Sequence, residues 1–431
     1  MAKWMGKPAP LMEASRAQHG DMWTLQLLGN TTFVFVSEPT LMEQFFTADP
    51  DVLRAGAAHQ RIGTALLGAR SLLLLDEPEH MEIKNLLMPA FKSDHVQRYR
   101  EGIERVVLEE INSWPLYEPL PMLPRMQKIA LDTIMTTTFG GTTGTELENL
   151  RDRIRDLIGW AENPAHMGHL HLAHRFEKGY PKGFLRVRDA LDDALFDVIH
   201  RYRNDPRLDE RDDVLAMMIQ ARREGGGALS DKQLRDQLVT LMMQGHTSTA
   251  TALAWALERL VRHPAVLDRL RDEEGSVGGD GEYLDAVVKE SLRARPPLPI
   301  AGAREVSRPY QLGEYEIPAD TLVAACIWLL HQHEGLYPEP QRFRPERFLE
   351  RPATQWTWIP FGGGHRHCIG ASLALMQMKI VLRTLALRTR LEPAAQADEP
   401  AQRRGVGFSP ASGGLVVLQD RAREGAARVA A

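Results

Sequence analysis

The order of hydrophobic and polar residues predicts a chain that is mostly helical, with two short β-rich stretches. Near the N-terminus, β-branched and aromatic residues surround Gly29-Asn30, which predicts a β-hairpin at about 24–36. From residue 39 to about residue 200, apolar residues recur at three- and four-residue spacing, interrupted by proline and glycine. We therefore expect helices over most of this region.

The strongest helical pattern begins at Ser230, which forms a capping box with Gln233, and continues until a proline follows His263. A helix over about 231–263 is a rod of about 50 Å, at ~1.5 Å per residue. Its middle, 244–249, reads Gln-Gly-His-Thr-Ser-Thr, where glycine and hydroxyl side chains weaken helical hydrogen bonding. This predicts a functional bend or groove, and the alternative is a helix crossing that needs small residues.

The last third of the chain changes to short strands and irregular segments. A hairpin with a glycine turn is predicted at 311–318, and a buried strand at 321–327. Aromatic, proline and glycine residues predict irregular chain at 343–348 and 356–364, before a helix restarts at about Ile369. The fold class predicted is mainly α with a small β-rich subdomain.

Composition narrows the class of protein. The 431 residues are 43% hydrophobic and 25% charged, which excludes a disordered or membrane-embedded chain. The formal charge of -5 provides no global basic field for nucleic acid. No targeting segment is visible, and the longest apolar run, 322–330, is far shorter than the ~20 residues that span a bilayer. We expect a soluble, cytoplasmic protein without a membrane anchor.

A group of histidines raises a metal hypothesis. The segment 163–181 lies between two prolines and contains His166, His169, His171 and His174. Their spacings of three, two and three suit no single helical face, so a long solvated or substrate-facing loop is the better interpretation.

The chemistry centres on one of only two cysteines. Cys326 belongs to the predicted buried strand, whereas Cys368 follows three glycines and precedes a helix. Glycines let a backbone lie flat against a planar partner, and the helix dipole and nearby basic side chains favour a thiolate. One alternative is a phosphate-binding loop, although the Lys-Ser/Thr of such loops is missing. Another is a redox or nucleophilic cysteine beside His365 and His367.

The same segment resembles the heme-binding signature F-x-x-G-x-R-x-C-x-G of cytochrome P-450 enzymes, through Phe361, Gly364, Arg366, Cys368 and Gly370. The resemblance implies the P-450 fold, a single catalytic domain over 1–431, and heme b as cofactor. It also makes Cys368 the axial iron ligand, and assigns the other four signature residues to cofactor binding.

Two further motifs follow the order of that family. Glu290 and Arg293 fit E-x-x-R, and Arg347 lies in a P-E-R-F segment. Alone, the first pair would be an exposed salt bridge worth under ~1 kcal/mol. The resemblance instead implies that these three residues form a buried structural network beneath the heme.

The resemblance also implies partners for the heme propionates. His80, Lys84 and Arg304 occupy matching positions, together with Arg366. Lys84 departs from the more usual arginine, because its ammonium holds a carboxylate as a point charge. Without the motif context, each such basic residue would be read as part of a solvated face.

The middle of the long helix aligns with the family pattern A-G-x-D/E-T-T/S. Thr247 stands at the acidic position and Ser248 at the alcohol position, flanked by His246 and Thr249. The hydroxyl is kept and the carboxylate is missing. We expect protons to arrive through water, His246, substrate groups or another residue, with slower or less coupled oxygenation or a substrate that supplies its own hydroxyl.

The function implied is a monooxygenase of secondary metabolism that uses O2 and oxidises an apolar small molecule, whether terpenoid, steroid-like, fatty-acid or polyketide. Residues 55–75 and 163–184 occupy the substrate-recognition regions of the family. Electrons would come from a separate ferredoxin and ferredoxin reductase. These would dock on a basic face made of Arg342, Arg344, Arg347, Arg351, His365 and Arg366. The alternatives are a peroxygenase, desaturase or rearrangement enzyme, motivated by Thr247, and a non-enzymatic heme-binding sensor.

Overall fold

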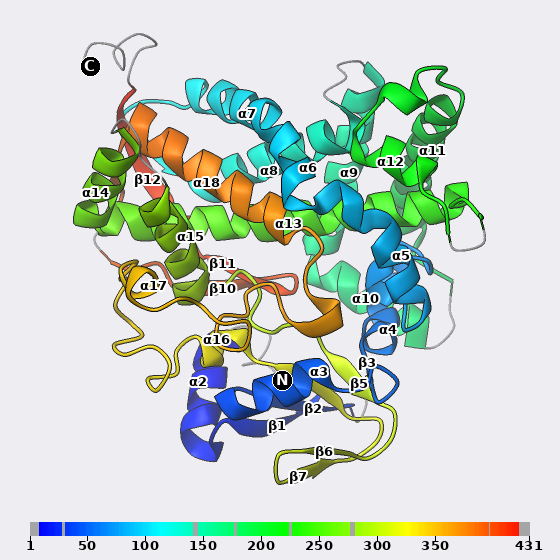
Figure 1. Ribbon diagram of the computed structural model, residues 1–431, viewed down its shortest axis with the longest axis horizontal. Coiled ribbons are helices and arrows are strands. Elements are labelled where there is room, and N and C mark those ends of the chain that lie inside the picture. Colours follow the sequence, from blue (N-terminus) through cyan, green and yellow to red (C-terminus); the bar gives the residue numbers. More distant parts are fainter. Residues whose placement is uncertain are drawn as a thin grey trace.

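A computed structural model describes residues 8–27, 31–140, 145–175, 179–223, 226–275, 281–395 and 397–421. Helices dominate it, and strands β1, β2, β3 and β5 lie below the central helix α13 in the view of Figure 1. The helices are α2 (Pro8–His19), α3 (Met42–Thr47), α4 (Ala55–Leu67), α5 (Glu79–Leu87), α6 (Ser93–Val96), α7 (Arg100–Asn112), α8 (Met122–Phe139), α9 (Thr145–Glu162), α10 (Pro164–Arg175), α11 (Lys182–Arg203), α12 (Val214–Gln220), α13 (Asp231–Arg262), α14 (Pro264–Gly275), α15 (Glu282–Ala294), α16 (Ile327–Leu330), α17 (Arg347–Glu350) and α18 (Ala371–Arg388).

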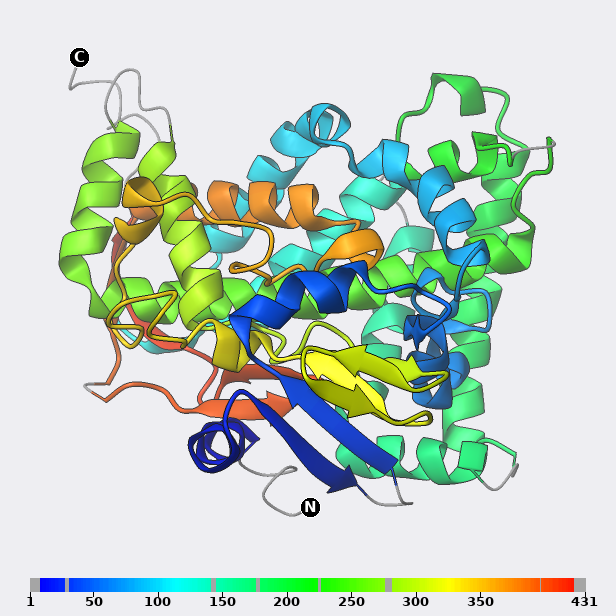
Figure 2. The ribbon, with the colours of Figure 1, turned by 60° about the horizontal axis from the view of Figure 1, so that its bottom comes forward.

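The strands form one five-stranded sheet and three smaller ones. The large sheet has the order β1-β2-β8-β5-β3, with β2 and β8 parallel, and Figure 2 brings it forward below the helices. The strands are β1 (Met22–Leu27), β2 (Thr31–Val36), β3 (Leu53–Arg54), β4 (Pro119–Pro121), β5 (Arg304–Val306), β6 (Tyr310–Leu312), β7 (Tyr315–Ile317), β8 (Leu322–Ala325), β9 (Thr389–Pro393), β10 (Ala401–Arg404), β11 (Gly407–Pro410) and β12 (Leu415–Arg421).

Both hairpins predicted from alternation are confirmed. The strands β1 and β2 pair antiparallel, with Leu25 opposite Phe33, while the expected turn at Gly29-Asn30 lies outside the described residues. The second hairpin is β6-β7, and its turn residue Gly313 has φ +60°, a conformation that side chains with a Cβ rarely adopt.

The central helix α13 begins where the capping box predicts. The Ser230 hydroxyl accepts a hydrogen bond from the Gln233 amide at 3.3 Å, and the Gln233 side chain accepts one from the Ser230 amide at 3.0 Å. The helix runs without interruption to Arg262 and packs along α8 and α18, which lies beside it in Figure 1. The predicted interruption at 244–249 is therefore not a break in the helix, because backbone hydrogen bonds continue through it.

Two other expectations are corrected. The segment expected as a long loop at 163–181 contains α10, because Pro164 suits a first helical position and the Asn163 side chain accepts the Ala165 amide at 3.0 Å. The buried strand expected to reach residue 327 ends at Ala325, where the chain turns into α16.

The hydrophobic core lies mainly around α13, α8 and α18. A second cluster lies between the five-stranded sheet and α3. Within the part of the chain that is described, no helix is long and apolar enough to cross a membrane.

Candidate heme-thiolate site

Residues 361–370 form a tight loop that leads into α18. The Cys368 amide donates to the Phe361 carbonyl at 2.9 Å, which closes the loop. The glycines before it are required by close packing, since a Cβ on Gly363 would lie 2.8 Å from the Phe46 ring of α3. Gly364 has φ +61° and lies against the Phe46 carbonyl. At these two positions the missing Cβ lets the loop pack against α3.

The Cys368 side chain borders open space, although it lies within the molecule. Its side chain is exposed by surface area, whereas burial raises the pKa of its thiol, partly offset by the Gly370 amide and the Lys84 ammonium. The exposure of Cys368 and the effect of burial on its pKa agree if the thiol faces an enclosed space inside the molecule. A Cβ placed on Gly370 would likewise meet no atom within 4 Å. An iron-bound group has room here.

The middle of α13 opens in the same way. Residues two turns on either side are buried, while Gln244 is exposed and Thr247 and Ser248 are half-buried. The Ser248 hydroxyl donates to the Gln244 carbonyl one turn earlier, at 2.7 Å. This stretch of α13 is therefore more accessible than the turns on either side of it.

The two remaining residues predicted for proton delivery are buried. His246 lies against the Gln127 backbone on α8, and burial, reinforced by Arg155, lowers the pKa of its imidazole to about 4. Its ring is therefore neutral near pH 7. Thr249 is also buried. The structure thus separates this pair from the exposed Gln244 and half-buried Ser248.

Basic side chains from four parts of the chain meet beside the cysteine loop. We call Lys84, Arg304 and Arg366, together with His59, His80 and His365, the basic cluster. Sequence reasoning predicted the three charged residues and His80. It missed His59, because an isolated histidine carries no spacing signal, and it considered His365 only beside Cys368 and not as a partner of these cations.

The positive charges of the basic cluster repel one another and so lower each other's pKa. Burial, followed by the charge of Arg366, lowers the pKa of Arg304 to about 10. Burial, then Arg366 and Lys84, lower the pKa of His80 to about 3. The ring of His80 is therefore neutral, and its Nδ1–H donates to Glu77 at 2.8 Å. Three permanent cations share this space with two carboxylates, Asp76 and Glu77.

The unmet hydrogen bonds of the basic cluster suit the two carboxylates of a heme. Arg304 is almost fully buried and donates to the Phe45 carbonyl at 2.8 Å, and no carboxylate within the described chain pairs with it. Arg366 donates to the Leu75 carbonyl at 2.7 Å, yet its buried Nε has no acceptor. Unpaired buried donors of this kind are rare unless a ligand completes them. The residues present therefore fit a heme, with Cys368 at the iron.

Asp76 and Glu77 are further residues that sequence reasoning missed. The Asp76 carboxylate accepts from the Gly56 and Ala57 amides at 2.6 and 3.0 Å, and so fixes the start of α4. Glu77 accepts from the Met81 amide at 3.0 Å and from His80. An Asp-Glu pair just before a helix is a common capping pattern, so the sequence alone gives it no link to a site.

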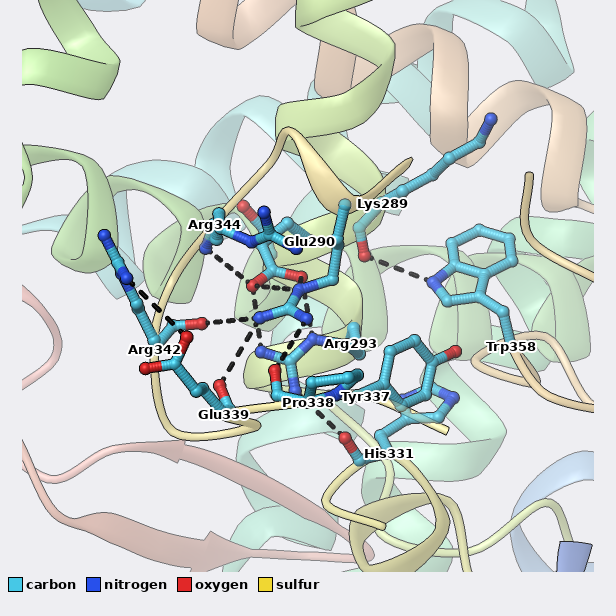
Figure 3. A network of polar contacts seen from close by, with 12 residues as sticks. Lys289, Glu290, Arg293, His331, Tyr337, Pro338, Glu339, Arg342, Arg344 and Trp358 are labelled. Carbon is cyan, nitrogen blue, oxygen red and sulfur yellow. Dashed lines mark hydrogen bonds and ion pairs between the residues drawn. The ribbon is translucent and has the colours of Figure 1, made fainter. Parts of the chain in front are cut away.

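A second buried network joins α15 to the start of α17 and is drawn in Figure 3. Arg293 donates to the Glu290 carboxylate at 2.7 and 2.9 Å, and Arg347 donates to it at 3.2 Å. The Arg344 amide adds a bond to Glu290 at 2.8 Å, and Arg293 also reaches the His331 carbonyl at 2.9 Å. All three predicted members are buried. Their predicted contact is confirmed; their placement relative to a heme stays a prediction.

The histidine-rich segment shows no sign of a metal site. His166 stacks on Trp160 with ring centroids 4.6 Å apart, and its Nδ1 lies 3.1 Å from the Trp160 carbonyl. The side chains of His171 and His174 lie outside the described residues. Elsewhere in the described chain, no three His, Cys, Asp or Glu side chains gather as metal ligands.

Comparisons with known proteins agree on one family. The sequence model described as Cytochrome P450 matches residues 3–417. The protein named cytochrome P450 135B1 of Mycobacterium tuberculosis is 35% identical over 416 residues, 94% of this chain and 86% of its own length. Cytochrome P450 138 of the same species is 35% identical over 407 residues, 94% of this chain and 90% of its own.

Solved structures share the fold at lower identity. The retinoic acid-bound cyanobacterial CYP120A1 superposes with a TM-score of 0.81 at 22% identity, covering 97% of each chain. The cytochrome P450DA heme domain gives a TM-score of 0.80 at 22% identity, covering 96% of this chain and 93% of its own.

Proposed function

Because this chain belongs to the cytochrome P450 family of heme-thiolate monooxygenases, we propose that it oxidises an apolar small molecule held between α4, α10 and the middle of α13. Terpenoid, steroid-like, fatty-acid and polyketide compounds all suit such a pocket. Heme b is the proposed cofactor, and the chain is proposed to work as one catalytic domain. The observation that carries the assignment is the exposed Cys368 next to the basic cluster, where Arg304 has no carboxylate partner in the described chain and the buried Nε of Arg366 has no acceptor.

The proposed roles follow from the contacts. Cys368 holds the iron, Arg304 and Arg366 hold the propionates, and His80 orients the carboxylate of Glu77 next to them. Phe361, Gly364 and Gly370 shape the loop around the ligand. A thiolate-ligated heme supplies the activation of O2 and the oxidation of an unactivated C–H bond.

The substrate pocket is supported by two segments that the structure brings together. The helices α4 and α10 lie within the two predicted substrate-recognition regions, and they pack against each other. His59 of α4 also lies beside the segment that leads into β5, since its ring is 3.4 Å from a Cβ placed on Gly302. An apolar pocket with a few polar anchors is the usual form of such sites.

Proton delivery is proposed to run through Ser248 and water. The Ser248 hydroxyl is half-buried at the accessible stretch of α13, where it can donate to a water or a substrate oxygen instead of the Gln244 carbonyl. Thr247 stays near His246, with its Oγ1 3.4 Å from His246 Nδ1, and adds no carboxylate. Thr247→Glu is expected to raise the fraction of NADH consumption that yields product. Unchanged coupling would count against this account.

Electrons are proposed to come from a separate ferredoxin and its reductase. Arg342 and Arg351 are exposed just before the cysteine loop, which suits an acidic partner. The basic face is smaller than the sequence predicts, because Arg347 is buried and Arg344 pairs with Glu350 at 2.8 and 3.0 Å.

The decisive experiment is the spectrum of the reduced protein with CO. The Soret band typical of thiolate-ligated heme is expected in the wild type and absent in Cys368→Ala. Its absence in the wild type would overturn the assignment of Cys368. The second candidate, a peroxygenase, is favoured by the lack of an acid at Thr247. Product formed with hydrogen peroxide but not with ferredoxin and NADH would select it.

A further inference from the structure

The ammonium of Lys84 points into the cysteine loop. Lys84 shares the buried face of α5 with His80. Its Nζ donates to the His365 carbonyl at 2.5 Å and to the His367 carbonyl at 3.1 Å. These carbonyls stand three residues and one residue before Cys368 in the chain. One ammonium therefore bridges the turn that precedes the cysteine and ties that turn to α5.

The charge of Lys84 is held by peptide oxygens. Lys84 is buried, and within the described chain no carboxylate lies at ion-pair distance from its Nζ. Burial lowers the pKa of Lys84, as does Arg366, while Cys368 and Glu77 favour its charged form. A positive charge beside a cysteine favours the thiolate over the thiol.

The shape of a lysine ammonium suits this position. Its three donors point in different directions from one atom, so two of them can reach two carbonyls on opposite sides of a turn. An arginine fork is planar and matches a single carboxylate. The departure from arginine at residue 84 therefore fits a bond to the loop better than a bond to a propionate, for which Arg304 and Arg366 keep free donor capacity.

We propose that Lys84 is a positioning residue that fixes the cysteine loop through the His365 and His367 carbonyls, and whose charge raises the heme reduction potential. This inference rests on the proposed heme-thiolate assignment of Cys368. It assigns Lys84 to the cysteine loop instead of the propionates, where the sequence predicts it.

The test uses the heme-loaded protein and Lys84→Met, which keeps the length of the apolar stem and removes the charge and both hydrogen bonds. In mild denaturant, the ferrous-CO complex of the variant is expected to lose its thiolate-type Soret band about tenfold faster than the wild type, with heme still bound. Its reduction potential is expected to shift to a more negative value, because the ferrous site carries more negative charge. Lys84→Arg keeps the charge and is expected to keep the potential near that of the wild type.

Arg304→Met is the matched control, since it removes a buried cation of the same cluster that does not touch the loop carbonyls. Faster transfer of heme to an acceptor protein is expected for this control, while the fraction of its bound heme that shows the thiolate band stays unchanged over time. If Lys84→Met shows that same pattern and an unchanged potential, Lys84 is a propionate partner and the inference is wrong. A wild type without any thiolate band would instead overturn the assignment of Cys368.

Discussion

Two buried groups of arginines in this molecule differ in how completely they are paired. In the Glu290 network, one carboxylate accepts from Arg293, Arg347 and a backbone amide, and peptide carbonyls accept the remaining donors. In the basic cluster, Arg304 has one carbonyl, and Arg366 keeps a buried Nε without an acceptor. The first group is complete within the chain, and the second needs a ligand. Pairing, rather than residue type or burial, separates a structural network from a binding site.

The completeness of the Glu290 network has an energetic consequence. Arg347 also donates to three peptide carbonyls, those of Pro338, Glu339 and Arg342, at 3.1, 3.4 and 3.1 Å. Removing the single carboxylate leaves two buried cations without a counter-ion, which is far more costly than losing an exposed pair. Arg304 of the basic cluster already lacks a carboxylate partner in the described chain, so removing its charge is not expected to destabilise the folded, heme-free protein.

The largest effect is expected for Glu290→Gln. The substitution keeps the shape of the side chain but leaves Arg293 and Arg347 without a carboxylate, so the free energy of unfolding should fall by about 3–5 kcal/mol. Urea unfolding followed by circular dichroism measures it, with heme content as a second readout. A loss under ~1 kcal/mol would show that the peptide carbonyls alone stabilise the network.

Acid should destabilise the folded protein near the Glu290 network by protonating His331, whose carbonyl accepts a hydrogen bond from Arg293. Its buried Nε2 accepts the Ile359 amide at 3.1 Å, and burial, followed by Arg293, lowers the pKa of the ring to about 3. Because this value lies below the ordinary value of about 6.5, the stabilisation is complete above about pH 6.5 and is lost as the pH falls towards about 3.

At about pH 5 the loss for this one ring amounts to about 2 kcal/mol. His331→Gln keeps an acceptor for the Ile359 amide and does not titrate, so its unfolding free energy should fall less between about pH 7 and pH 5. His246, with a lowered pKa of about 4, is unchanged in both proteins and serves as the internal reference. Equal pH dependence of the two proteins would exclude His331 as the source.

Arg304→Met tests the basic cluster, the second of the two arginine groups. The variant removes a buried cation that no carboxylate of the described chain pairs with, so the heme-free protein should be as stable as the wild type or slightly more stable. The loaded protein should release heme about tenfold faster, because a propionate loses a charge-assisted donor. Transfer of heme to an acceptor protein measures the rate. A large loss of stability in the heme-free protein would place Arg304 with the structural arginines.

The smallest effect is expected for Glu350→Gln, the matched control for Glu290→Gln. Glu350 pairs with Arg344 at 2.8 and 3.0 Å next to the Glu290 network, but the pair is exposed. Water screens exposed pairs, so the unfolding free energy should change by less than ~1 kcal/mol, and less still in high salt. A change as large as that of Glu290→Gln would mean that proximity to the network, and not burial, sets the cost.

Much of the fold could be predicted from local pattern. The capping box of Ser230 and Gln233 fixes the start of α13, and alternation fixes both hairpins. The segment 163–181 was predicted wrongly, because histidines and prolines suggested a loop where Pro164 begins a helix. Proline at a first helical position and proline in a loop look alike in a sequence when the apolar periodicity between them is weak.

In the candidate site, too, the sequence predicted some features and could not predict others. Motif spacing identified Cys368, Glu290, Arg293 and Arg347, because each belongs to a short pattern with fixed intervals. It could not assign His246, which the alignment placed beside Ser248 and which packs against α8 instead. Adjacent residues on a helix point about 100° apart, so neighbours in a motif need not share a surface.

The sequence by itself determined the helical class of this protein, its central helix, the cysteine proposed as its heme ligand and the members of its buried carboxylate network. Each of these follows from residues close together in the chain or from a pattern of fixed spacing. Only the tertiary structure decided which arginines are satisfied and which remain open, and that Lys84 reaches the carbonyls of His365 and His367. The physical reason is that a buried charge is balanced by groups from distant parts of the chain, whose approach no local pattern specifies.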